Sequence, residues 1–167
     1  MSFPELPPVE TRIGPLLLSR GWWLAVAESC TGGLLGHRIT NVPGASAYFR
    51  GGVIAYANEV KMQLLGVPED VLLEHGAVSE PTVRAMAWGV KERLQADVAL
   101  AISGIAGPGG GTPEKPVGTT WIALATPEGI QARRYRFSGS REENKWQATE
   151  AALQWLLEVL QTARPLE

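Results

Sequence analysis

A serine that could act as a nucleophile follows the first strongly apolar segment of the chain. Residues 22–27 are predicted to form a buried strand, and Ser29 comes directly after it, ahead of Gly32-Gly33 and a helix-like segment. This order places Ser29 at the carboxyl end of a strand and beside the N–H groups of a helix start, which stabilise an anion or an oxyanion. The same turn serves backbone geometry alone in many α/β folds, so a purely structural interpretation stays open at this point.

A lysine after the second strand candidate is a candidate partner for Ser29. Lys61 lies on the opening turn of a helix that follows the strand candidate at 49–56. If the two strands are neighbours, both side chains face the same edge of the sheet, where ligands of α/β sheets bind. The dipole at a helix start favours the neutral amine, which can accept the serine proton and return it to an amine leaving group. A solvated helix lysine is the alternative interpretation of the same spacing.

Two further segments could bring polar groups to that edge. The glycine-rich loop at 103–112 follows the third strand and allows close backbone approach to a ligand. It has neither the Gly-Lys-[Ser/Thr] of a Walker A loop nor a G-x-G-x-x-G that opens a helix. Arg141 begins the last helix and suits a phosphate or a carboxylate, although a plain surface position is the default for it.

The elements that must position these groups alternate in type along the chain. Helices are predicted at 8–20, at 32–40, from Asn58 as a cap, from Pro68, from Ser79 as a cap, and at 141–163. Strands are predicted at 22–27, 49–56, 97–103, 117–125 and 130–137, the last two joined by a hairpin turn. This order predicts an α/β fold, a three-layer α/β/α sandwich with a mixed, mostly parallel sheet. We expect a single domain over residues 1–167, with its core at about 8–163.

The composition is that of an ordinary globular protein. Of the 167 residues, 45% are hydrophobic and 19% are charged, and the net charge of -2 offers no attraction to nucleic acid or to an anionic membrane. The single cysteine, Cys30, fits a reducing compartment. The two histidines, His37 and His75, lie far apart, and no metal-binding spacing occurs, so we expect no metal. No apolar run is long enough for a bilayer, so a cytoplasmic protein is expected that binds neither a membrane nor nucleic acid.

Several blocks of sequence occur in a characteristic order: AESCTGG at 27–33, PGAS at 43–46, GGVIAYAN at 51–58, Lys61, LGV at 65–67, GAVS at 76–79, SGIAGP at 103–108 and KPVGT at 115–119. Taken together, they resemble the CinA C-terminal domain family, whose stand-alone members are nicotinamide-nucleotide amidases. The resemblance covers roughly residues 8–163.

The resemblance implies hydrolysis of the carboxamide of nicotinamide mononucleotide to nicotinic acid mononucleotide and ammonia, with no cofactor. The serine–lysine pair attributed to the family maps onto Ser29 and Lys61, and Tyr56 would assist the pair. The residues expected to hold the oxyanion or the substrate are Thr31, Gly32, Gly33, Ser46, Ser103, Gly104, Gly107, Arg141 and Lys145. For the oxyanion itself, the geometry of the turn favours N–H groups near Thr31 and Gly32.

One departure from the family pattern concerns substrate binding. The family usually shows a hydrophobic residue and a second arginine where this chain has Asn144-Lys145. Lysine keeps the charge but lacks the planar fork that suits a phosphate, so weaker affinity or a different preferred nucleotide would follow. Relatives commonly assemble, so a homo-oligomer is expected. Two alternatives remain: a non-catalytic pyridine-nucleotide-binding module, and an amidase that acts on another small carboxamide.

Overall fold

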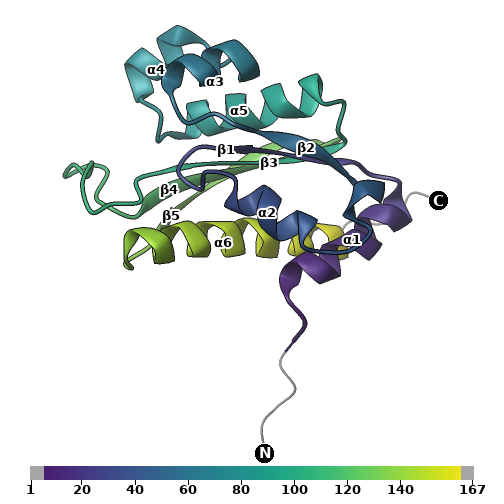
Figure 1. Cartoon of the computed structure of the whole chain (residues 1–167). Coiled ribbons are helices and arrows are strands. Elements are labelled where there is room, and N and C mark those ends of the chain that lie inside the picture. Colours follow the sequence, from purple (N-terminus) through teal and green to yellow (C-terminus); the bar gives the residue numbers. More distant parts are fainter. Residues whose placement is uncertain (1–5, 163–167) are drawn as a thin grey trace, which may run out of the picture.

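A five-stranded sheet with helices on both faces forms the molecule, which Figure 1 shows with the sheet edge-on. The computed structural model describes residues 6–162. The helices are α1 (Val9–Arg20), α2 (Leu34–Thr40), α3 (Asn58–Leu65), α4 (Glu69–His75), α5 (Glu80–Arg93) and α6 (Arg141–Thr162), with a 3-10 turn, η1, at Ala45–Ala47. The strands are β1 (Leu24–Glu28), β2 (Phe49–Ile54), β3 (Val98–Gly104), β4 (Thr119–Thr126) and β5 (Gly129–Arg136).

The strand order is β2-β1-β3-β4-β5. β1 pairs in parallel with β2 and with β3, whereas β4 pairs antiparallel with β3 and with β5. Helices α3, α4 and α5 cover one face of the sheet, and α1, α2 and α6 cover the other (Figure 1). The predicted three-layer α/β/α sandwich with a mixed sheet is therefore confirmed.

The two faces of the sheet differ in side-chain size because large and small residues alternate along the central strands. On the α1/α2/α6 face the buried strand residues are Leu24, Val26, Val98, Leu100, Ile102, Ile122 and Leu124. On the α3/α4/α5 face they are Ala25, Ala27, Ala99, Ala101, Ala123 and Ala125. Alanine side chains let a helix lie close to the sheet, so α5 packs directly on the central strands.

The helix α3 is held close to α5 at a glycine. A β-carbon at Gly89 would overlap the carbonyl of Leu65, so only glycine permits this contact. The predicted cap of α5 is confirmed, because the Ser79 hydroxyl accepts from the N–H of Thr82. The predicted Asn58 cap is wrong: Ala57 is the cap residue, and Asn58 is already the first residue of α3.

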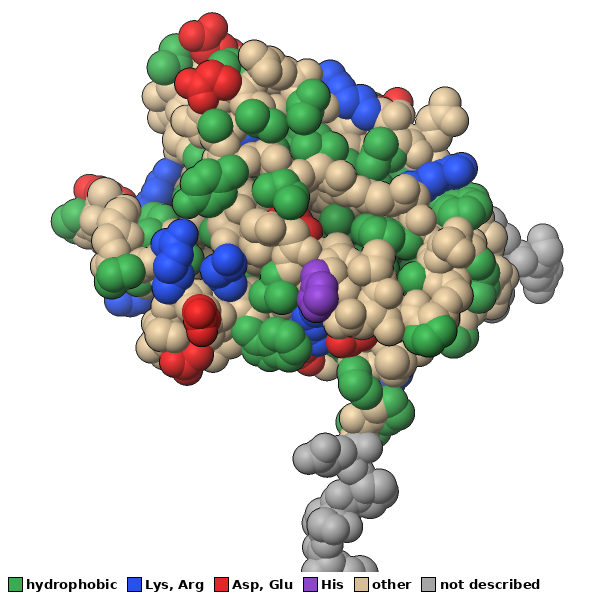
Figure 2. Space-filling model, viewed as in Figure 1, with side chains coloured by type: hydrophobic (Ala, Val, Ile, Leu, Met, Phe, Trp, Pro, Cys, Tyr) green, Lys and Arg blue, Asp and Glu red, His purple; other side chains and the backbone are tan. Residues whose placement is uncertain are grey.

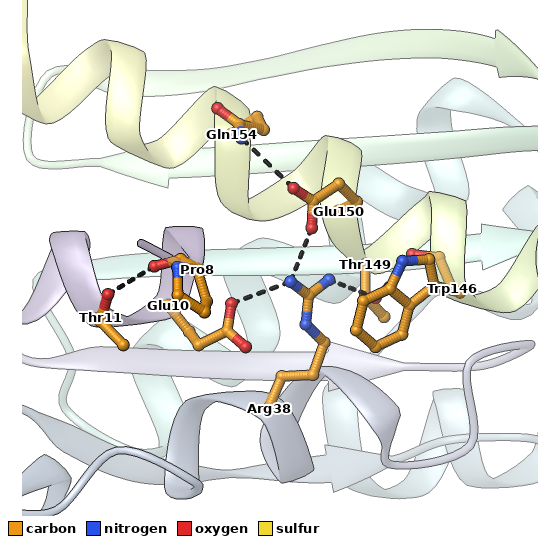
Figure 3. A network of polar contacts seen from close by, with 8 residues as sticks. All are labelled: Pro8, Glu10, Thr11, Arg38, Trp146, Thr149, Glu150 and Gln154. Carbon is orange, nitrogen blue, oxygen red and sulfur yellow. Dashed lines mark hydrogen bonds and ion pairs between the residues drawn. The ribbon is translucent and has the colours of Figure 1, made fainter. Parts of the chain in front are cut away.

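A buried ion-pair network joins three helices on the other face (Figure 3). Arg38 of α2 lies between Glu10 of α1 and Glu150 of α6, and its guanidinium also contacts the Thr149 hydroxyl at 3.1 Å and the Trp146 ring at 4.1 Å. This network fixes the helical layer behind the sheet. None of the helices within residues 6–162 combines the length and the apolar character needed to span a membrane.

Candidate active site

Ser29 is held at the carboxyl end of β1 by the sheet itself. Its N–H donates to the carbonyl of Ile102 at 3.0 Å, which continues the pairing of β1 with β3 beyond Glu28. Ser29 is only 7% exposed. The hydroxyl therefore has a fixed position, and the groups that contact it decide its reactivity.

Lys61 reaches this hydroxyl from the start of α3. Side chains of a helix lean toward its N-terminus, so the amine is carried back to the point where β2 ends. Its Nζ lies 3.0 Å from Ser29 Oγ, 2.8 Å from the carbonyl oxygen of Ala55 and 2.9 Å from that of Tyr56. The expectation that the two strands are neighbours is confirmed, and both residues lie at the same edge of the sheet.

The three partners of the Lys61 amine suit its neutral form. The carbonyl oxygens of Ala55 and Tyr56 can only accept, whereas the Ser29 hydroxyl can also donate. A neutral amine carries two N–H bonds and one lone pair. It can therefore donate to both carbonyls and turn its lone pair to the Ser29 proton, which is the arrangement of a general base and its nucleophile.

Burial also favours the neutral form of the Lys61 amine. Lys61 is 1% exposed, and no carboxylate in the described part of the chain forms an ion pair with it. Desolvation lowers the pKa of Lys61 from its ordinary value of 10.5, while the influence of Cys30 acts in the opposite direction. Burial also raises the pKa of the Cys30 thiol to about 11, so this thiol is neutral near pH 7. Both side chains beside Ser29 are thus driven toward their uncharged forms.

The helix start after Ser29 is occupied by a carboxylate of the protein itself. Glu28 is 2% exposed. Its oxygens accept from the Thr31 hydroxyl at 2.7 Å and from the N–H groups of Gly33, Leu35 and Gly36 at 3.2, 2.8 and 3.0 Å. A buried carboxylate requires such donors, and the positive end of the α2 dipole stabilises it further.

This occupation corrects the oxyanion assignment made from the sequence. The Gly33 N–H donates to Glu28, and the Gly32 N–H donates to the carbonyl of Ser29 at 3.1 Å, so neither is available to a substrate. The Thr31 hydroxyl is also engaged by Glu28, whereas the N–H groups of Cys30 and Thr31 have no acceptor within residues 6–162. Most donors of this turn therefore stabilise the fold, and within the turn an oxyanion could accept from these two N–H groups alone.

A cavity of about 250 Å³ opens in front of the Ser29–Lys61 pair. Of the residues predicted for the site, those that line it are Ser29, Tyr56, Lys61, Ser103, Gly104, Gly107 and Arg141. Ala77 and Val78 line the cavity as well, although they were not predicted to belong to the site. The buried Ser103 hydroxyl donates to the carbonyl of Ala77 at 2.8 Å, so it ties this wall to β3. Within the described residues, no group of three or more His, Cys, Asp or Glu side chains could hold a metal ion.

Tyr56 contacts Lys61 through its carbonyl oxygen and not through its phenol. Its side chain is exposed, and its hydroxyl accepts from Arg141 Nη2 at 3.4 Å. Arg141 Nη1 donates to the carbonyl of Gly107 at 2.7 Å, so this arginine joins the mouth of the cavity to the glycine-rich loop. The contact of Tyr56 with Lys61 is thus made by its backbone, and the assistance predicted for this residue stays a prediction.

Five predicted site residues lie outside the cavity lining: Thr31, Gly32 and Gly33 of the turn described above, and Ser46 and Lys145. Ser46 is exposed in η1, ahead of β2, whereas Ser29 follows β1. Because β1 and β2 are parallel, Ser46 is at the opposite end of the sheet, and the five residues of β1 span roughly 17 Å. Lys145 lies beside the Gly32 turn, with its Nζ 3.7 Å from where a Gly32 β-carbon would be. A sequence block identifies a residue, but only the fold decides at which end of a strand it lies.

Asn144 was not among the residues predicted for the site. This residue is 3% exposed and bonds two loops next to the cavity, through the carbonyl of Ala106 and the N–H of Gly139. The only sequence signal was that an amide stands where the family usually has an apolar side chain.

Comparison with known proteins places the chain in a family. The family model described as the CinA C-terminal domain matches residues 7–160. The chain belongs to the CinA C-terminal domain family. The CinA C-terminal domain thus accounts for nearly all of the sequence, in agreement with the resemblance found in its motif blocks.

Relatives of this CinA domain include full-length proteins and solved structures. It is 48% identical over 159 residues to a CinA-like protein of Geotalea uraniireducens, covering 95% of this chain and 38% of that protein. It is 55% identical over 130 residues to a CinA-like protein of Gemmatimonas aurantiaca, covering 78% of this chain and 30% of that protein. The chain therefore spans about a third of the length of the curated relatives that it matches. The crystal structure of a CinA superfamily protein from Klebsiella pneumoniae is 39% identical, with a TM-score of 0.89, and the match covers 93% of this chain and 97% of that chain.

Proposed function

We propose that this CinA domain is an amidohydrolase that converts nicotinamide mononucleotide to nicotinic acid mononucleotide and ammonia. The observation that carries the proposal is the 3.0 Å contact between the buried Lys61 amine and the Ser29 hydroxyl, in the wall of a cavity. A lysine buried without a carboxylate partner is costly to the fold, and beside a nucleophile such a group indicates catalysis. The choice of substrate rests on the resemblance of the motif blocks to the stand-alone amidases of the family.

The first half of the reaction transfers the acyl group to the enzyme. Neutral Lys61 takes the proton of Ser29 while Ser29 Oγ forms a bond to the carboxamide carbon, and the carbonyl π electrons move onto its oxygen. When this oxyanion collapses, the C–N bond breaks, Lys61 returns the proton to the leaving nitrogen, and ammonia departs. The cationic pyridinium ring withdraws electrons from the amide and eases the attack.

The second half releases the acid. Water attacks the ester carbonyl on Ser29, and Lys61, neutral again after the first half, takes a proton from that water. Collapse of the second oxyanion breaks the bond to Ser29 Oγ, which regains its proton from Lys61. The net change is one water consumed and one amide converted to a carboxylic acid and ammonia.

The size of the cavity indicates how the substrate would lie. Its volume of about 250 Å³ is below the roughly 300–1,000 Å³ of pockets that enclose a drug-sized ligand. It suits the pyridine end, with the ribose phosphate extending outward toward Arg141 and Lys145. Figure 2 shows basic side chains gathered over the start of α6 and the adjoining loop, where a phosphate would meet positive charge.

The test is ammonia release from nicotinamide mononucleotide by the wild type, Ser29→Ala and the matched control Ser19→Ala, which changes an exposed serine on α1. We expect release by the wild type and the control, and a loss of at least about 10³-fold in Ser29→Ala. A nicotinoyl adduct on Ser29, detected by mass spectrometry after rapid quenching, would be the acyl-enzyme.

Three other outcomes would contradict the proposal in different ways. Equal release by Ser29→Ala would exclude the serine as nucleophile. Release from other carboxamides alone would keep the mechanism and change the substrate. Binding of the nucleotide without ammonia from any amide would favour a non-catalytic binding module.

A further inference from the structure

The first turn of α6 holds two consecutive carbonyl groups of the glycine-rich loop. Asn144 Nδ2 donates to the carbonyl of Ala106 at 3.0 Å, and Arg141 Nη1 donates to that of Gly107 at 2.7 Å. Asn144 Oδ1 also accepts from the N–H of Gly139 at 2.9 Å. The buried amide of Asn144 thus acts in both directions, as a donor to the loop and as an acceptor from the segment before α6.

The contact with Asn144 fixes the direction of the peptide group between Ala106 and Gly107. In a trans peptide the C=O and the following N–H point in opposite directions, and this bond is trans. Because the Ala106 carbonyl turns toward Asn144 on α6, the Gly107 N–H turns away from that helix.

The Gly107 N–H is a buried donor that lacks a partner in the protein. It has no acceptor within residues 6–162, yet Gly107 is buried and lines the cavity together with Ser29 and Lys61. Buried N–H groups without a partner are rare, and one at the wall of a cavity is available to an oxygen of a ligand. At a φ of 85°, and with Val117 filling the space where a β-carbon would lie, position 107 requires glycine.

We propose that Asn144 is a positioning residue that turns the Gly107 N–H toward the oxyanion formed at Ser29. This inference rests on the amidohydrolase function proposed above. The α2 helix start cannot supply most of its donors, because Glu28 occupies them. The Gly107 peptide supplies a donor in addition to the N–H groups of Cys30 and Thr31, which have no acceptor within residues 6–162, and Asn144 keeps the Gly107 donor from rotating away.

Two substitutions separate positioning from general support of the fold. Asn144→Asp keeps the shape and the acceptor for Gly139 but, once ionised, removes the donor to Ala106. Asn144→Leu removes both bonds, and Gln147→Leu, one turn later and exposed on α6, is the matched control. We expect kcat to fall about 10- to 100-fold in Asn144→Leu with KM within about twofold, and the control to match the wild type.

The aspartate variant adds a pH signature. Its introduced carboxyl can donate to the Ala106 carbonyl while protonated and repels it once ionised, and burial raises the pKa of such a group. The ratio of variant to wild-type kcat is therefore expected to fall as the pH rises. Because ionisation of a buried carboxyl also lowers the free energy of unfolding, kcat is compared only over the pH range in which urea denaturation shows the variant to be fully folded.

A second measurement does not depend on turnover. The amide resonance of Gly107 in ¹⁵N-labelled protein is followed as nicotinic acid mononucleotide is added, whose carboxylate stands in for the oxyanion. We expect a downfield shift in the wild type that is lost in Asn144→Leu. The inference would be overturned by a Gly107 resonance that does not shift when the product is added. Wild-type kcat in both variants, or an effect confined to KM, would overturn it as well. A wild type that releases no ammonia refutes the amidase, and the Gly107 shift then decides the positioning role on its own.

Discussion

Two basic side chains are buried within residues 6–162, and their surroundings are opposite in kind. Arg38 is 3% exposed, and its Nη2 lies 2.9 Å from a carboxylate oxygen of Glu10 and 2.6 Å from one of Glu150 (Figure 3). Lys61 is 1% exposed and contacts one hydroxyl and two carbonyl oxygens, with no carboxylate. Both are fully desolvated, so the difference lies in the charge of their partners.

The charge of the contacting groups decides whether a buried basic side chain stabilises the fold or is suited to react. A guanidinium between two carboxylates keeps its charge and ties three helices together. An amine among neutral acceptors is driven to lose its proton, which gives it a lone pair for Ser29. A buried basic side chain that contacts carboxylates therefore stabilises the helical layer. One that contacts only neutral groups favours its uncharged form and is suited to the role of base that we propose for Lys61.

The substitution Lys61→Met is expected to abolish the activity and to leave the fold intact. Ammonia release should fall by about 10⁴-fold or more because Ser29 loses its base. The free energy of unfolding should change by no more than about 1–2 kcal/mol, since the removal of an unbalanced buried amine offsets the loss of its hydrogen bonds to the carbonyls of Ala55 and Tyr56. Activity and urea denaturation are measured on the same preparation. A loss of several kcal/mol would show that Lys61 is structural after all.

The substitution Arg38→Met should have the opposite profile. It leaves the Glu10 carboxylate buried without a partner, so the free energy of unfolding should fall by about 3–5 kcal/mol, while the folded protein keeps its activity. Adding Glu10→Gln to it should restore part of the loss, because the uncompensated charge is then removed. Chemical denaturation of the single and double variants checks this, and no recovery in the double variant would contradict the charge-balance argument.

The pH dependence sharpens the comparison. Because burial lowers the pKa of Lys61 below 10.5, kcat/KM should rise with pH through that lowered pKa and then level off. The unfolded chain still binds the Lys61 proton where the folded chain has lost it, so the wild type should gain stability relative to Lys61→Met as the pH rises toward 10.5. Rate profiles and urea denaturation between pH 6 and about 10 test both statements, and a flat rate profile would remove lysine as the base.

The smallest effect concerns Cys30, whose buried thiol follows Ser29 in the sequence. With a pKa raised from 9.0 to about 11, its thiolate fraction at pH 8 is about 100-fold lower than in the unfolded chain. A thiol reagent should therefore modify Cys30 at least about 100-fold more slowly in the native protein than in urea. Its contribution to stability should be present below pH 9 and lost as the pH rises through about 11. Equal rates in both states would show that burial does not suppress charge at this site.

The sequence predicted the layers and the reactive pair because both depend on local order. Alternating strand and helix patterns predicted the sandwich, and Ser29 and Lys61 each follow a strand whose neighbours could be inferred. Conventional turn signals were less reliable: Ser79 caps its helix, but Asn58 does not. The hydrogen-bond acceptors of the Lys61 amine could not be read from spacing, since they are backbone carbonyls.

The assignments that failed share one physical cause. Ser46 was carried over as a site residue, yet the parallel register places it at the far end of the sheet. Gly32 and Gly33 were expected to help hold an oxyanion, yet the Gly32 N–H donates to the Ser29 carbonyl and the Glu28 side chain accepts from the Gly33 N–H. In both cases the deciding contact joins groups whose positions depend on the whole fold.

By itself, the sequence determined the family, the α/β architecture and the serine that a strand must present beside a turn. These follow from residue order, because hydrophobic periodicity and glycine turns act over a few residues. Only the tertiary structure decided that Lys61 contacts neutral groups, that Arg38 contacts carboxylates, and that Asn144 donates to the glycine-rich loop at Ala106. These contacts depend on which residues, far apart in the sequence, the fold buries together. In the low-dielectric interior, the groups that contact a side chain determine its charge and its reactivity.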